Sequence, residues 1–155
     1  GISINTNFSI GFATFIVSIS VLLLWIPLKQ KLGIGTILNA IIISIVLDYS
    51  YPYLPKPDEF FYQILQSFLG VLIVGLGSGF YLIANLGAGP RDGLMTGIQK
   101  ISKFPIFFVR ALIEITVVLI GWYLGGVVGL GTIIFALFVG PFVSLGLVFV
   151  KIFFK

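Results

Sequence analysis

Long apolar runs constrain this chain more than any other feature of its sequence. An α-helix needs roughly 20 mainly apolar residues to cross about 30 Å of hydrocarbon. Five runs close to that length follow one another between short polar breaks, at 8–28, 35–51, 60–86, 106–124 and 131–150. The sequence therefore predicts an all-α, polytopic transmembrane bundle with about five spans.

The composition favours a bilayer as the surroundings of these helices. Hydrophobic residues make up 59% of the chain and charged residues only 9%, whereas soluble domains have roughly 25% charged residues. The net charge of +4 does not predict nucleic-acid binding, because the basic residues fall mostly in the breaks between apolar runs. Lipid is the expected partner, beside a small-molecule or ion substrate and either further copies of the chain or a membrane partner protein.

The sequence contains few of the residues that enzymes use for catalysis. The chain contains no cysteine and no histidine, which removes thiolate chemistry, the commonest general base and the commonest zinc ligand. No two acidic residues stand at the i,i+3 or i,i+4 spacing of a metal site: they are Asp48, Asp58, Glu59, Asp92 and Glu114. We expect no catalytic residue, no bound metal and no cofactor.

The basic residues also predict an orientation, because cytoplasmic loops carry an excess of lysine and arginine. If the loops alternate sides, Lys56 alone falls on one side and Arg110 lies within a span. The other side receives Lys29, Lys31, Arg91, Lys100, Lys103, Lys151 and Lys155. We expect a multi-pass membrane protein with a cytoplasmic C-terminus.

The sequence matches itself at an offset of 96 residues. Residues 8–48 fall on 104–144 with 12 identities in 41 positions and no gap. The most specific part of the match is a G-x-G-T block that sits in the short turn between two spans in each copy. Its residues are Gly33, Gly35 and Thr36 in the first copy, and Gly129, Gly131 and Thr132 in the second.

The offset predicts a domain organisation. Residues 1–51 form the last two spans of a first repeat, 52–59 an extracytoplasmic loop, and 60–155 a second repeat of three spans. Three spans is an odd number, so consecutive copies insert in opposite directions, as in many secondary transporters. A first span and its loop, roughly 35 residues, are expected ahead of residue 1, which gives six spans in an inverted 3+3 repeat.

The first candidate site is the break in the helical pattern at 87–93. Gly87, Gly89 and Pro90 interrupt the helix, and Pro90 suits the first position of a new short helix. Arg91 and Asp92 follow, and an amphipathic helix within 87–103 is expected to lie at or re-enter the membrane interface. One interpretation is an ion or substrate site. The other is a cytoplasmic turn in which Asp92 caps the helix, and the spacing slightly favours this second interpretation.

The second candidate site is the pair Arg110 and Glu114. These residues are four apart on one predicted helical face, inside an apolar span where a charge costs on the order of 3 kcal/mol. They form either a functional site or a structural pair that locks two helices together. The G-x-G-T blocks are simpler, and we interpret them as tight turns in which the threonine caps the next helix.

Several of these segments resemble one family of bacterial membrane proteins. The stretch from Leu86 to Met95, L-G-A-G-P-R-D-G-L-M, is similar to the L-G-x-G-P-x-D motif of the YczE/YyaS/YitT-like proteins. The resemblance extends over nearly the whole chain, through the segments 110–114, 121–126 and 129–132. It implies a bacterial inner-membrane protein, and an equivalent Gly-Pro loop in the first repeat that is absent from this sequence.

The function that these features favour is a small-solute transporter or permease-like protein. Arg91, Asp92, Arg110 and Glu114 would be its charged lining, with the Gly-Pro loop as a hinge. The alternative is a non-transporting accessory or scaffold protein of the membrane that supports another complex.

Overall fold

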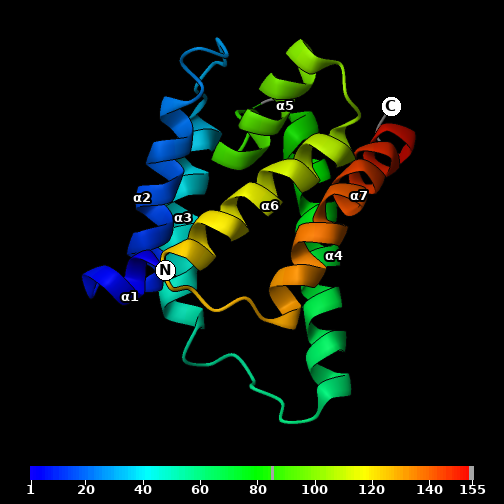
Figure 1. Ribbon diagram of the computed structural model, residues 1–155. Coiled ribbons are helices and arrows are strands. Elements are labelled where there is room, and N and C mark those ends of the chain that lie inside the picture. Colours follow the sequence, from blue (N-terminus) through cyan, green and yellow to red (C-terminus); the bar gives the residue numbers. More distant parts are fainter. Residues whose placement is uncertain (85, 154–155) are drawn as a thin grey trace.

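The computed structural model describes residues 1–84 and 86–153, and every regular element in this part of the chain is an α-helix. Figure 1 shows a bundle in which a hairpin of two helices stands beside the helices of the second half. The elements are α1 (Ile2–Thr6), α2 (Ile10–Leu23), α3 (Ile34–Ser50), α4 (Phe60–Ala84), α5 (Pro90–Ser102), α6 (Ile106–Tyr123) and α7 (Leu130–Phe153).

Three of these helices, α4, α6 and α7, are long and apolar enough to cross a membrane. The all-α prediction is thus confirmed, while five spans and an inverted repeat stay predictions. The first predicted span is the one that differs most, because α2 ends at Leu23 and a series of turns follows as far as Lys29. Pro27 accounts for this end, since proline cannot donate the hydrogen bond that would continue the helix. At 14 residues, α2 is only about 21 Å long.

α4 and α7 form the closest helix pair, and glycine makes this approach possible. Gly75 faces Phe142 and Val143 of α7, while Gly79 lies directly against the backbone of Gly146. Small residues four apart let two helix backbones approach closely, as in membrane helix dimers. Aromatic side chains fill the space beside this contact, with Phe68 edge-on to Phe142.

α2 and α3 pack together as the hairpin of the first half. The carboxylate of Asp48 on α3 accepts hydrogen bonds from the Ser9 hydroxyl at 2.6 Å and the Gly11 amide at 2.7 Å. The first amides of any helix lack hydrogen-bond partners within that helix. Asp48 therefore supplies a partner for one of these amides at the start of α2. Gly11 also lies against the Ser44 carbonyl, so a larger residue there would push the two helices apart.

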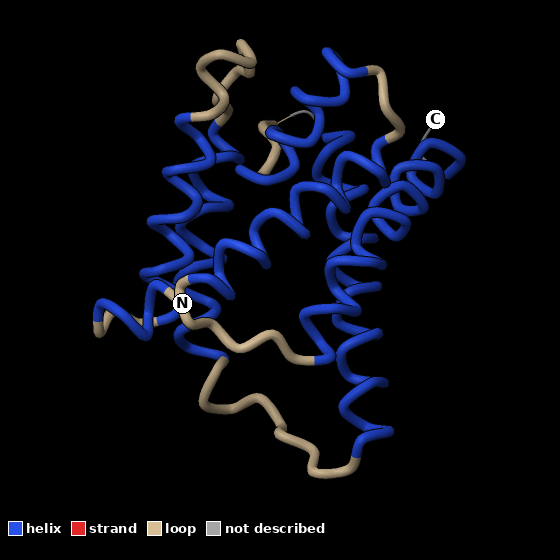
Figure 2. Tube along the Cα trace, in the orientation of Figure 1, coloured by secondary structure: helices blue, strands red, loops and turns tan. Residues whose placement is uncertain are grey.

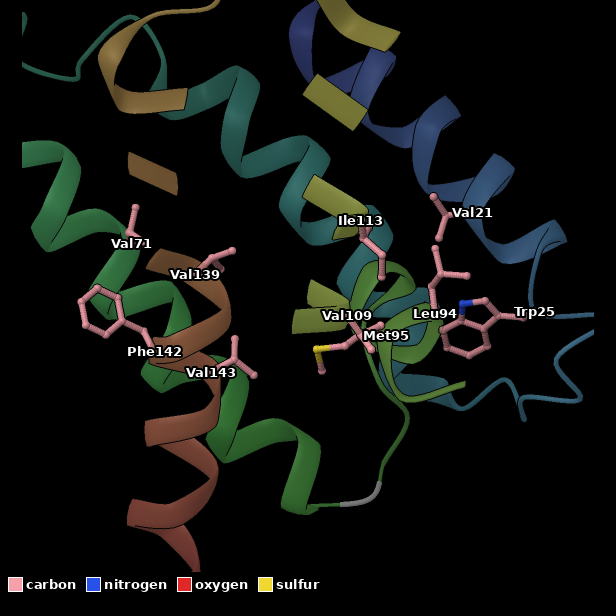
Figure 3. Close-up of a cluster of buried hydrophobic side chains, with 10 residues drawn as sticks. All are labelled: Val21, Trp25, Val71, Leu94, Met95, Val109, Ile113, Val139, Phe142 and Val143. Carbon is pink, nitrogen blue, oxygen red and sulfur yellow. The ribbon is translucent and has the colours of Figure 1, made fainter. Parts of the chain in front are cut away.

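The buried side chains connect α5 with the rest of the bundle. Figure 3 shows Leu94 of α5 beside Trp25, and Met95 of the same helix beside Val109 of α6. The same cluster continues to α4 and α7 through Val71, Val139, Phe142 and Val143. α5 is therefore held inside the bundle on one face, although it is too short to span a membrane.

The loops lie at two opposite ends of the bundle. In Figures 1 and 2, the turn 24–33, the connection from α5 to α6 and the last turn of α7 are at the upper end. The connections 51–59 and 124–129 lie lower. These upper segments carry Lys29, Lys31, Lys100, Lys103 and Lys151. The compartment that this end faces stays a prediction, and Lys155 lies outside the described residues.

Candidate functional site

The break between α4 and α5 has the backbone that its glycines and proline favour. Gly87 has φ 119°, a conformation that residues with a Cβ atom rarely adopt. Gly89 is the N-cap residue of α5 and Pro90 its first residue, where a missing amide donor costs nothing. The chain can therefore leave α4 and enter α5 within a few residues.

This loop packs against the G-x-G-T turn of the first half. The Gly35 amide at the start of α3 donates to the Leu86 carbonyl at 3.0 Å. A Cβ atom at Gly33 would overlap the Leu86 carbonyl and Gly87, and one at Gly87 would meet the Thr36 hydroxyl. Two motifs more than 50 residues apart in sequence are thus one contact in the structure.

Thr36 lies three residues after Gly33, the N-cap residue of α3. Its side chain is fully buried, and its hydroxyl accepts a hydrogen bond from the Gly33 amide at 3.4 Å. In the second block the Thr132 amide donates to the Gly129 carbonyl at 3.1 Å. A Cβ atom at Gly129 would meet nothing within 4 Å, and one at Gly131 would meet only Ser67. Among the described residues, no Gly-Pro loop packs on this second turn.

Four charged residues meet between α5 and α6. Arg110 donates through Nη1 to Asp92 Oδ1, and its Nη2 lies 3.0 Å from Glu114 Oε1. Arg91 Nη1 lies 3.5 Å from Glu114 Oε2 and extends the group outward. We call Arg91, Asp92, Arg110 and Glu114 the charge network. The structure thus brings both candidate sites of the sequence together in a group of two cations and two anions.

The network is buried at its centre and reaches the surface at one corner. Arg110 and Glu114 are each 3% exposed and Asp92 is 6% exposed, whereas the Arg91 side chain is 35% exposed. Burial raises the pKa of the Asp92 carboxyl above its ordinary value, and the neighbouring Arg110 guanidinium opposes that rise. The contact with Arg110 and the burial of Asp92 show that this carboxyl faces the interior of the bundle rather than solvent.

Not every polar atom of the network is satisfied. Arg110 Nε and Glu114 Oε1 are buried and have no hydrogen-bond partner in the part of the chain that the structure describes. Glu114 Oε1 lies at ion-pair distance from Arg110 Nη2, so it keeps the electrostatic attraction without hydrogen-bond geometry. The free donor at Nε is the more unusual, because buried polar groups are nearly always bonded.

Trp25 is the residue of this region that the sequence did not single out. It is 2% exposed, and its indole Nε1 donates to the Pro90 carbonyl at 2.9 Å. A Cβ atom at Gly93 would overlap the indole ring, so the absence of a side chain on α5 makes room for it. An isolated tryptophan near the end of an apolar run usually indicates an interfacial anchor, and only the turn after α2 directs it inward.

We expect Trp25→Phe to lower the free energy of unfolding by about 1 kcal/mol. The variant removes one buried hydrogen bond, which contributes roughly 0.5–1.5 kcal/mol, and keeps most of the ring volume. Trp122→Phe is the matched control, because Trp122 is 66% exposed and its replacement is expected to change stability by less than about 0.5 kcal/mol. Unfolding in mixed detergent micelles measures both, and equal losses would contradict a special contact at Trp25.

The acidic residues do not gather into a metal site. No group of three or more histidine, cysteine, aspartate or glutamate side chains occurs within residues 1–84 and 86–153. Each carboxylate of the charge network instead faces an arginine. This arrangement presents a buried guanidinium donor and two carboxylates, with the partly exposed Arg91 side chain at its edge.

The fold and site define a class: a helical membrane protein with a buried charge network beside a broken helix. The model of a family of unknown function, DUF6198, matches residues 1–147. The chain therefore belongs to this family.

Two relatives agree with that assignment. An uncharacterized protein of Haemophilus influenzae is 46% identical over 144 residues, which cover 93% of this chain and 66% of the relative. The uncharacterized membrane protein YczE of Bacillus subtilis is 37% identical over 107 residues, 69% of this chain and 50% of YczE. The resemblance to YczE is thus confirmed, and the chain spans between half and two thirds of each relative. No solved structure matches the chain.

Proposed function

We propose that this protein carries a small solute across the membrane and that the charge network is the site where the solute binds. The observation that supports the proposal is the burial of four charged side chains between α5 and α6 in a bundle whose composition is that of a membrane protein. Ionisable groups at such places are rare because they are costly, and they commonly mark substrate or ion pathways.

The network also suggests the class of solute. The buried Arg110 Nε carries a hydrogen that no described residue accepts, and guanidinium groups prefer carboxylate and phosphate oxygens. A small anion or an anionic metabolite is therefore the proposed solute. It would reach Arg110 past Arg91, the one member of the network that is partly exposed.

The neighbouring backbone supports a role in movement. The Gly-Pro loop leads directly into the helix that carries Arg91 and Asp92. Transporter sites are often built from interrupted helices of this kind, with irregular backbone only where it lines a site. A small rotation at Gly87 or Gly89 would shift both residues relative to Arg110.

A thermal-shift screen on the full-length protein in detergent tests the binding step. The probes are chloride, sulfate, inorganic phosphate, acetate, succinate and lactate. A ligand at 100 times its Kd stabilises the folded state by about 2.7 kcal/mol, so at least one anion should raise Tm clearly. The same anion should leave Tm of Arg110→Lys unchanged, because lysine keeps the charge but loses the planar set of donors.

Flux separates transport from binding. Vesicles that contain the full-length protein should take up the anion found in the screen, and Arg110→Ala and Glu114→Ala should abolish uptake while the protein still inserts. Normal flux in both variants would remove the charge network from the mechanism. Binding without flux in the unaltered protein would contradict transport and leave an accessory role for the chain.

A further inference from the structure

A second polar region lies beside α5. Gly93, Thr96 and Lys100 recur three and four residues apart and so share one side of the helix. Together with the turn after α2 and the Gly-Pro loop, they line a hollow of about 620 Å³. That volume falls within the range of roughly 300–1,000 Å³ that is usual for ligand sites. We call this space the basic hollow.

The charges of the basic hollow have one sign. Lys29, Lys31 and Lys100 line it, and none of the described residues that line it is acidic. Lys29 and Lys31 come from the first half of the chain and Lys100 from the second, so the fold brings them together. Lys29 adopts φ 50° and the Gln30 amide donates to the Trp25 carbonyl at 3.2 Å, which closes the turn between the two lysines and α2.

Apolar side chains complete the wall. Trp25 and Leu82 line the hollow beside Leu32 and Leu86, and the last two are strongly exposed, at 61% and 72%. Cations next to exposed leucines suit a ligand with a negative group joined to a hydrocarbon part. Basic pockets between membrane helices bind phosphate-bearing lipid head groups for this reason.

We propose that the basic hollow binds the phosphate of an anionic phospholipid, with Lys31 and Lys100 on the head group and the leucine wall against an acyl chain. This inference does not depend on transport, because no member of the charge network lines the hollow. Lys29 and Lys31 belong to the turn after α2 and Lys100 to the last turn of α5, and both segments are at the upper end in Figure 1. In a bilayer spanned by α4, α6 and α7, we expect this end to lie at the level of the head groups.

Trp25 offers a direct signal from the hollow. The chain has two tryptophans, so Trp122→Phe leaves Trp25 as the single one. The Trp122→Phe variant of this 155-residue chain is reconstituted in phosphatidylcholine vesicles that contain brominated phosphatidylglycerol, or brominated phosphatidylcholine for comparison. Bromine quenches the fluorescence of nearby indoles only. Brominated phosphatidylglycerol should therefore quench Trp25 fluorescence more strongly than its fraction of the total lipid would predict.

The decisive comparison uses two double variants with equal change in charge. Lys31→Gln with Lys100→Gln removes two cations of the hollow, whereas Lys103→Gln with Lys151→Gln removes two at the same end but outside it. Each lysine near a membrane surface raises the affinity for anionic lipid about fivefold. The variant that lacks Lys31 and Lys100 should therefore bind phosphatidylglycerol, relative to phosphatidylcholine, about 5- to 30-fold more weakly. The second pair should leave it nearly unchanged.

Three outcomes would overturn the proposal. Equal quenching by the two brominated lipids would show no preference for the anionic head group. An equal loss in both double variants would mean that the lysines act only through the general charge of this end. Loss of the preference in 10 mM inorganic phosphate would assign the hollow to a free phosphate instead of a lipid.

Discussion

Replacing Arg110 with methionine is expected to lower the free energy of unfolding by about 3–5 kcal/mol. The side chain is 3% exposed and contacts both Asp92 and Glu114. Its removal leaves two buried carboxylates with only the more distant Arg91 to balance them. Breaking a buried ion pair in this way costs several kcal/mol, because the remaining charge is neither hydrated nor paired. Titration with a denaturing detergent, followed by circular dichroism, measures the loss.

A compensating variant identifies the cause of that loss. Arg110→Met combined with Asp92→Asn removes one charge of each sign and keeps the contact of Arg91 with Glu114, which lies at 3.5 Å. We expect the double variant to recover at least half of the stability lost in Arg110→Met. If the two variants are equally unstable, the unpaired carboxylate is not the cause, and Arg110 acts through packing of its side chain.

Replacing Gly79 with leucine is expected to cost about 3 kcal/mol or more and to separate α4 from α7. A Cβ atom at this position would overlap the backbone of Gly146, which cannot move aside as a flexible side chain can. Overpacking of a tight contact typically costs about 1–3 kcal/mol, and clashes with backbone belong at the upper end. The same unfolding titration measures this effect.

The matched control lies two residues away in the same helix. A Cβ atom at Gly77 would meet nothing within 4 Å, so Gly77→Leu has room. It is expected to be neutral or to stabilise the helix by up to about 1 kcal/mol, since glycine is a poor helix former. Similar losses at both positions would show that leucine disturbs α4 itself rather than its contact with α7.

The helices themselves could be predicted well from the sequence. The predicted ranges 35–51, 60–86, 106–124 and 131–150 differ from α3, α4, α6 and α7 by no more than three residues at either end. Apolar runs, prolines and polar breaks are local signals, and they determine where a membrane helix starts and stops. The end of α2 was less clear, because the apolar run continues through the turns after Leu23.

The contacts between segments that are distant in the sequence could not be predicted in this way. The Arg110 and Glu114 pair follows from helical spacing, and the structure places the two in contact. The contact of Arg110 with Asp92 joins two helices, and nothing in the spacing of 18 residues predicts it. Trp25 was missed for the same reason, since its contact with Pro90 depends on the turn that redirects the chain after α2.

The hydrogen bond from the Gly35 amide to the Leu86 carbonyl has a consequence for how such proteins vary. It joins the beginning of α3 to the Gly-Pro loop through main-chain atoms alone. Many side chains could change on either segment without altering it, provided that the glycines at 33 and 87 remain small. Correlated side-chain substitutions among related sequences would therefore not reveal this contact between the two segments.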